Sequence, residues 1–94
     1  MPKVLDKSSI ETSLTQVPNW RKEGNEIRRT FEFSAYLDGI SFVDEIAKLA
    51  EQANHHPDID IRWRKVHLAL TTHSAGGLTH LDFDLAAKID TVYG

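Results

Sequence analysis

Cysteine is absent from this 94-residue sequence. The chain therefore has no disulfides, no thiolate chemistry and no cysteine-type zinc site. No run of about 18 apolar residues is present, so no segment is expected to span a membrane. The first residues lack the apolar segment of a signal peptide, which makes the cytoplasm the expected location.

Strong charge of one sign is also missing. The net charge is −3, and the largest basic group is the short run that contains Arg62, Arg64 and Lys65. This distribution argues against a surface that binds nucleic acid by neutralising phosphates. Hydrophobic residues make up 40% and charged residues 27% of the chain, as in an ordinary folded protein. Residues 1–94 are expected to form a single domain.

Hydrophobic periodicity predicts three helices and four strands. Asp6 or Ser8 could cap the first helix, and Pro18 should end it. We expect Asp38-Gly39 to break the second strand, Pro57 to end the second helix, and residues 74–77 to form a flexible turn. The expected helices are 6–17, 42–54 and 79–92, and the expected strands are 20–22, 27–34, 58–63 and 66–73.

The order of these elements, α-β-β-α-β-β-α, predicts an α+β fold. Two hairpins separated by a helix favour a four-stranded antiparallel sheet. Each predicted strand has one apolar face, so the three helices should pack on one face of the sheet. The other face should meet solvent or another subunit.

The histidines are the main chemical signal. His55 and His56 leave the end of the second helix, and His73 leaves the end of the fourth strand. If that strand lies beside that helix, the three rings could line one pocket. Histidine titrates near neutral pH and can act as an acid or a base. With Glu51 one helical turn before His55, the group would suit the addition or elimination of water.

Each of these residues also has an ordinary structural explanation. His55 and His56 could interact with the dipole of the helix end, and Glu51 could be a solvated helix residue. Asp82 could serve only as part of a helix cap with Thr79. The ordinary expectation is structural or interfacial for His67, solvated surface for His80, and core for Trp20 and Trp63. A metal site is disfavoured, because adjacent histidines point apart in an extended chain and no H-E-x-x-H spacing occurs.

Several motifs nevertheless occur together in one order. They are Glu51-Gln-Ala-Asn-His-His-Pro57, Trp63, Lys65-Val66-His67, Leu70-Thr-Thr-His73, Gly77-Leu78-Thr79 and Asp82. This pattern resembles the pterin-4a-carbinolamine dehydratase family. The sequence departs from it in small ways: the family often has Tyr and Asn at the positions of Trp63 and Arg64, and animal members have a basic residue at the position of Leu81.

The resemblance implies a hydro-lyase that converts 4a-hydroxytetrahydropterin to quinonoid dihydropterin, in the recycling of the pterin used by aromatic amino acid hydroxylases. It implies no metal and no organic cofactor. It places the catalytic residues at His55, His56 and His73, and the substrate-binding residues at Glu51, Pro57, Trp20 and Asp82. It also implies a homodimer or homotetramer, a pterin substrate and a possible hydroxylase pathway partner, without direct binding of nucleic acid or membrane.

The resemblance leaves a second function open. Animal members of the family also stabilise a transcription factor dimer, and some bacterial relatives are assembly factors without catalysis. A chain kept only for binding has no physical need of three clustered proton-transfer groups, so the three histidines favour the enzyme. A third hypothesis, a histidine metal site, could be tested by metal analysis.

Overall fold

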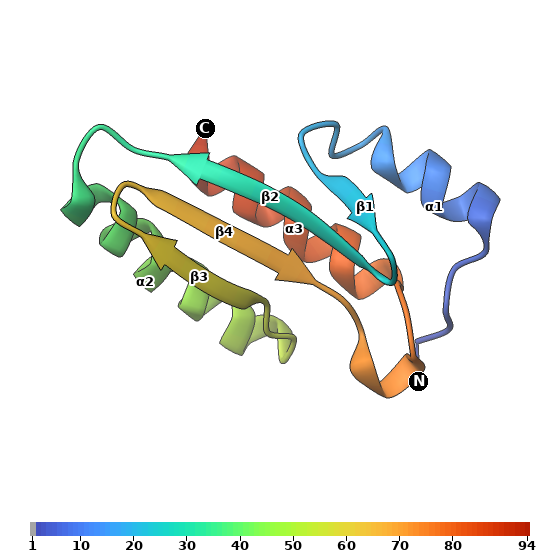
Figure 1. The fold of residues 1–94 in the computed structure, drawn as a ribbon. Coiled ribbons are helices and arrows are strands. Elements are labelled where there is room, and N and C mark those ends of the chain that lie inside the picture. The colour runs from blue at the N-terminus through green and yellow to red at the C-terminus, as the bar shows by residue number, and fades with distance from the viewer. Residues whose placement is uncertain (1) are drawn as a thin grey trace.

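A computed structural model describes residues 2–94 of the chain. The elements follow the predicted order, with a short 3-10 helix η1 added before the last helix (Figure 1). This confirms the α+β fold and the four-stranded antiparallel sheet. The elements are α1 (Lys7–Leu14), β1 (Arg21–Glu23), β2 (Glu26–Glu32), α2 (Tyr36–Ala53), β3 (Asp58–Arg62), β4 (Lys65–Leu70), η1 (His73–Ala75) and α3 (His80–Tyr93).

The four strands form one sheet in the order β1-β2-β4-β3, and every neighbouring pair is antiparallel. Helices α2 and α3 lie together behind this sheet, and α1 lies beside β1 (Figure 1). Alternate residues of the central strands point into the core, as the sequence pattern predicted. The fully buried ones on β2 and β4 are Ile27, Phe31, Val66, Leu68 and Leu70.

The start of α2 differs from the prediction. Asp38-Gly39 was expected to break the second strand before a helix over 42–54, but β2 ends at Glu32, and α2 begins at Tyr36 and contains both residues. Asp38 lies in the first turn, where its negative charge favours the positive end of the helix dipole. Gly39 is buried, and a Cβ atom there would lie 3.3 Å from the Phe33 ring. Glycine at this position lets the helix approach the end of β2 closely.

The hairpin between β3 and β4 corrects another expectation. Trp63 was expected on the third strand, with core as its ordinary role, but β3 ends at Arg62. Trp63 occupies the turn with a φ of 51° and is 70% exposed. Strand β4 ends at Leu70, and Thr72 is then held by an isolated bridge to Gly77.

Helix caps explain where two of the helices begin. Asp6 caps α1 by accepting a hydrogen bond from the Ser9 backbone N–H at 2.8 Å, so of the two candidates the structure selects Asp6. Helix α1 ends at Leu14, before Pro18 is reached. Thr79 and Asp82 form a capping box at the start of α3, which confirms that part of the prediction.

No helix within residues 2–94 combines the length and the apolar character that crossing a membrane requires.

Candidate active site

The end of α2 directs the two adjacent histidines to different places. Asn54 adopts the left-handed conformation, with a φ of 49°, which asparagine tolerates better than most residues. The chain then runs without regular structure to β3, and successive side chains of such a segment point apart. His55 is consequently buried, at 9% exposure, while His56 remains exposed. The two rings therefore do not enter one enclosed pocket.

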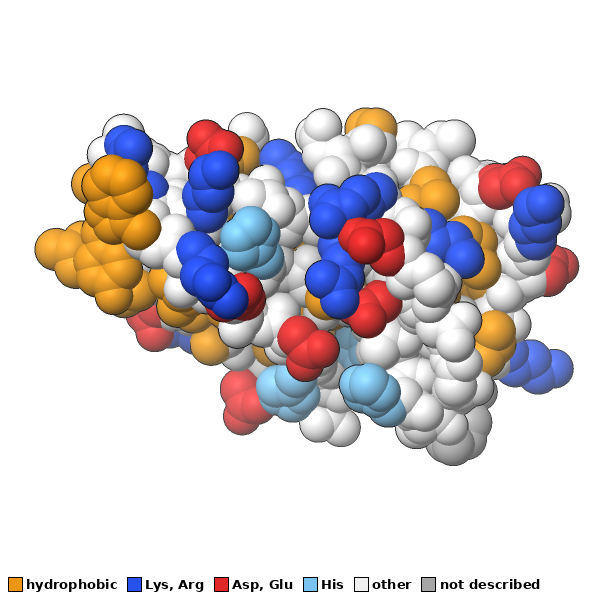
Figure 2. All heavy atoms as spheres, in the orientation of Figure 1, with side chains coloured by type: hydrophobic (Ala, Val, Ile, Leu, Met, Phe, Trp, Pro, Cys, Tyr) orange, Lys and Arg blue, Asp and Glu red, His pale blue; other side chains and the backbone are white. Residues whose placement is uncertain are grey.

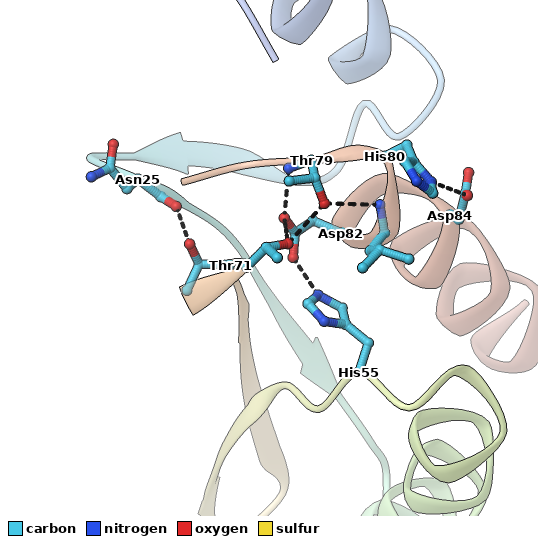
Figure 3. A network of polar contacts seen from close by, with 9 residues as sticks. Asn25, His55, Thr71, Thr79, His80, Asp82 and Asp84 are labelled. Carbon is cyan, nitrogen blue, oxygen red and sulfur yellow. Dashed lines mark hydrogen bonds and ion pairs between the residues drawn. The ribbon is translucent and has the colours of Figure 1, made fainter. Parts of the chain in front are cut away.

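His55 contacts a buried carboxylate that comes from another part of the chain. Its Nε2 atom lies 2.6 Å from Oδ1 of Asp82, at the start of α3 (Figure 3). Asp82 is 0% exposed, so this hydrogen bond is shielded from water and fixes the orientation of the imidazole ring.

The second carboxylate oxygen of Asp82 accepts two further hydrogen bonds. Its Oδ2 atom accepts from the Thr72 hydroxyl at 2.8 Å and from the Thr79 backbone N–H at 2.9 Å. The Thr79 hydroxyl lies 2.8 Å from the Thr72 hydroxyl and accepts from the Leu81 backbone N–H. Because the Thr72 proton goes to Asp82, the Thr79 hydroxyl donates to Thr72. The network thus ties the end of β4 to the start of α3 (Figure 3).

This network determines which nitrogen of His55 is free. A carboxylate can only accept, so the Nε2 atom of His55 carries the hydrogen that Asp82 binds. The Nδ1 atom is left to take up or release a proton. A buried carboxylate that orients a histidine in this way is a common arrangement for acid–base catalysis.

His56 has its own acidic partner on α2. Its Nε2 atom lies 2.6 Å from Oε2 of Glu51, within hydrogen-bond distance. Both side chains are largely exposed, so the pair adds little to stability. It nevertheless leaves the Nδ1 atom of His56 free, by the same reasoning as for His55.

His73 is the first residue of η1 and directly follows Thr72. It is exposed and borders a cavity of about 270 Å³ that residues from the β1–β2 hairpin and from the chain on either side of η1 also line. Its neighbour Thr72 bonds the same carboxylate as His55, so one network holds the segments that carry both histidines. Figure 2 shows histidine side chains gathered over the end of α2 and over η1.

The other residues singled out from the sequence lie elsewhere. Trp20 is 3% exposed, packs against Phe31 and donates its indole N–H to Asp90 at 2.8 Å, so its ring belongs to the core. Pro57 is half-buried beside the histidines in sequence. His80 pairs with Asp84 on the surface of α3, and His67 pairs with Thr30 on the outer face of the sheet, in agreement with their ordinary roles.

Thr72 is a member of this network that the sequence motifs did not point to. It falls within the expected strand 66–73, and its buried hydroxyl bonds both Asp82 and Thr79. A threonine on the inward face of a strand signals that a polar partner must be present inside. The sequence does not say which partner it is.

Residues 2–94 contain no group of three or more histidine, cysteine or acidic side chains placed to hold a metal ion.

Comparison with known proteins places this chain in a family. A family model described as pterin 4 alpha carbinolamine dehydratase matches residues 3–92. A protein of Roseiflexus castenholzii is 54% identical over 92 residues, which cover 98% of this chain and 99% of that protein. A protein of Chloroflexus aurantiacus is 54% identical over 94 residues and the full length of both chains. Both names assign the proteins provisionally to pterin-4-alpha-carbinolamine dehydratase.

Two solved structures share the fold. A protein of Brucella melitensis described as a transcriptional coactivator/pterin dehydratase has a TM-score of 0.94 and 30% identity, over 98% of this chain and 100% of that one. A pterin dehydratase-like protein identified as a RuBisCO assembly factor in the alpha-carboxysome has a TM-score of 0.70 and 26% identity, over 81% and 90% of the two chains. With the match over residues 3–92, these findings show that the chain belongs to the pterin 4 alpha carbinolamine dehydratase family.

Proposed function

We propose that this chain dehydrates 4a-hydroxytetrahydropterin to quinonoid dihydropterin. In this reaction the C4a–O bond breaks after an acid protonates the hydroxyl, and water leaves. A base removes the proton from N5, and the electron pair of that N–H bond forms the C4a=N5 double bond. One proton is given and one is taken, so two acid–base groups are sufficient. The proposal requires neither a metal nor an organic cofactor and keeps the expected cytoplasmic location.

The hydrogen bond between His55 and Asp82 is the observation that carries this proposal. A fully buried carboxylate fixes one nitrogen of His55 as a donor and leaves the other for proton transfer. A purely structural histidine at a helix end would not need a buried acidic partner from a distant helix, since contact with the helix dipole would suffice. The pairing therefore supports a catalytic role better than a capping role.

We assign the three histidines different parts of the reaction. His55 and His73 supply the acid, one for each stereoisomer of the 4a-hydroxyl. His56 positions the pterin ring or accepts the N5 proton, and its pairing with Glu51 supports this role because Glu51 fixes the ring and can stabilise its positive charge. Asp82 supports the pocket through His55.

The remaining contacts of the substrate belong to the same proposal. Glu51 and Pro57 stand next to the histidines in the chain and would border a bound pterin. Trp20 was also expected to wall the pterin ring, but its ring is enclosed by the core, so we assign it to the support of β1 and not to the pterin.

The test is the rate of dehydration of freshly generated 4a-hydroxytetrahydropterin. We expect the wild type to accelerate it, and His55→Ala and His73→Ala each to lose about 10²–10⁴-fold, the usual contribution of a positioned acid or base. His80→Ala is the matched control, because His80 is exposed and pairs with Asp84 on the surface of α3. A folded wild type that gives no acceleration would reject the proposal, and unchanged turnover in both variants would reject the histidine assignments.

A non-catalytic binding role is the second candidate. The structural neighbours described as a coactivator and an assembly factor favour it, as do the hydrophobic side chains that Figure 2 shows over the start of α2 and the β3–β4 hairpin. The exposed ones there are Tyr36, Leu37 and Trp63. A folded but inactive wild type in the assay above would make this the better hypothesis.

A further inference from the structure

The outer face of the sheet, opposite α2 and α3, carries a cavity that the dehydratase chemistry does not use. Its volume is about 410 Å³, and it shares no residue with the histidine site. Figure 2 shows this face as a mixture of basic and acidic side chains with a histidine among them. The polar side chains at the cavity are those of Arg21, Arg28, Thr30, Asp58, Asp60 and His67.

Strand pairing explains why the sheet is hollow here. Arg21 lies opposite Arg28, Arg28 lies opposite Ala69, and Ala69 lies opposite Asp58. In this row across the sheet, the small side chain of Ala69 lies between the two guanidinium groups and the carboxylate of Asp58. Neighbouring strands are about 4.8 Å apart, so Arg28 and Asp58 start about 10 Å apart on either side of this low point.

The arginine side is arranged to receive an anionic group. The Nε atom of Arg21 lies 2.8 Å from Glu23, and that of Arg28 lies 3.2 Å from Glu26. Within residues 2–94 neither guanidinium has another ion pair, so the terminal nitrogens of both remain available. Like charges directly opposite one another destabilise a sheet, and a bound carboxylate between them would offset this repulsion.

The opposite side is arranged to receive a cation. Asp58 has no ion pair among residues 2–94, whereas Asp60 is paired with Arg62 at 3.0 Å. The pKa of Arg28 is raised, first by its hydrogen bond to Glu26 and more weakly by the charges of Glu26, Glu23 and Asp58. Between the two sides, the Nδ1 atom of His67 is taken by the Thr30 hydroxyl at 2.7 Å, so the Nε2 atom is the nitrogen left for a ligand.

We propose that this cavity binds a small zwitterion, a free α-amino acid, with its carboxylate on Arg21 and Arg28 and its ammonium group on Asp58. The charge balance disfavours a simple anion as the ligand. The positive charges of the two arginines are balanced by Glu23 and Glu26, and Asp58 adds a third negative charge. A purely anionic ligand would be repelled by Asp58, and a purely cationic one would gain nothing from the arginines. A ligand with both charges satisfies both sides.

The test compares three molecules that share one branched alkyl chain and differ in the charged groups they carry. L-leucine carries both groups, 4-methylpentanoate only the carboxylate, and 3-methylbutylamine only the ammonium. Backbone amide shifts of residues 67–69 would be followed by NMR at millimolar ligand. We expect saturable binding of L-leucine, with each single-charge analogue weaker by about tenfold or more.

Variants locate the site independently. Arg28→Gln and Asp58→Asn should each weaken L-leucine binding by about tenfold or more, and Ala69→Leu should abolish it by filling the floor without a change of charge. Arg64→Gln is the control, because that guanidinium stacks on Trp63 away from the cavity. Absence of L-leucine binding, binding of 4-methylpentanoate as tight as that of L-leucine, or equal loss in Arg64→Gln would overturn the proposal.

Discussion

The buried carboxylate of Asp82 accepts three hydrogen bonds, from His55, Thr72 and the Thr79 backbone. These bonds require both carboxylate oxygens to be acceptors. Asp82→Asn keeps the size of the side chain but replaces one acceptor oxygen by a donor. Either His55 or the pair Thr72 and Thr79 then loses its acceptor. If the amide nitrogen faces His55, the Nε2 atom of the ring must accept a hydrogen bond. The hydrogen of the neutral ring then lies on Nδ1, which is the opposite of the arrangement with Asp82.

We therefore expect Asp82→Asn to lose about 1–3 kcal/mol of stability and about 10²-fold or more of dehydratase turnover. Urea unfolding and the dehydration assay measure the two effects. Asp84→Asn is the matched control, since Asp84 pairs with the exposed His80 on the surface of α3 and its substitution should leave both quantities unchanged. Full stability and activity in Asp82→Asn would contradict the network described above.

Thr72 tests the same network from the side of β4. Thr72→Val preserves the shape of the side chain but removes the hydroxyl that bonds Asp82 and Thr79. We expect a loss of about 1–3 kcal/mol in urea unfolding, because two buried groups lose a partner. Thr72→Ser, which keeps the hydroxyl, should recover most of it. Equal stabilities of the valine and serine variants would show that the hydroxyl contributes nothing.

At this scale the sequence drew attention to histidines and acidic residues but did not show which of these side chains pair with one another. Helix spacing placed Glu51 one turn before His55, but in the structure Glu51 pairs with the next residue, His56, which follows the end of α2. His55 and Asp82 are 27 positions apart, and their contact depends on how α3 packs against the end of α2. For Trp20, residue type suggested the core and the resemblance suggested the substrate site, and the tertiary arrangement encloses its ring in the core.

Helix α1 is an element whose stability should depend on pH through its cap. The pKa of Asp6 is lowered from its ordinary value of 3.8, first by the hydrogen bond from the Ser9 backbone. The pKa of Asp6 in the folded protein thus lies below its pKa in the unfolded chain. The cap therefore stabilises α1 fully at pH values above the ordinary pKa, and this stabilisation is lost as the pH falls through the folded pKa. The Ser9 amide shift should titrate with a midpoint below 3.8.

Asp6→Asn separates the cap from the titration, because asparagine caps helices equally well but carries no charge. The Ser9 amide shift of this variant should be flat over the same acidic range, while α1 persists. A midpoint at or above 3.8 in the wild type would show that the carboxylate gains nothing from the cap.

Gly39 makes a prediction about α2. Glycine inside a helix normally costs up to about 1 kcal/mol relative to alanine, so Gly39→Ala would ordinarily stabilise the protein. Here the added methyl group would lie 3.3 Å from the Phe33 ring. We expect no gain, or a loss, in urea unfolding. Ala47→Gly, at an exposed position of the same helix, should show the ordinary cost, and a gain of about 1 kcal/mol in Gly39→Ala would contradict the close approach.

Gly39 also shows where pattern reading of elements fails. Asp38-Gly39 has the composition of a chain break, and nothing local distinguishes a break from a helix start that needs a small residue for packing. The same holds for Trp63, whose alternation with Ile59 and Ile61 suggested a strand although the chain reverses there. The capping box of α3 was predictable because all of its bonds are local.

At the scale of the whole molecule, topology was predictable because two hairpins around a helix allow few arrangements of four strands. Assembly was not, since it depends on surfaces that one chain leaves uncovered. Strand β3 is an edge strand on which Ile59 and Ile61 are each 38% exposed, and Leu37 and Trp63 are more exposed still. Unpaired strand edges and exposed apolar side chains favour association with another chain.

We therefore predict that the protein is a homodimer or homotetramer, with a mass in solution of two or four times the chain mass of 10.6 kDa. Sedimentation equilibrium measures this directly. Ile61→Lys places a charge on the β3 edge and should shift the association equilibrium toward the monomer if that edge forms the subunit interface. Lys48→Glu, on the exposed face of α2, tests in the same way whether that helix forms the interface. A wild type that remains at the mass of one chain would show that these apolar side chains stay uncovered, or await a different partner.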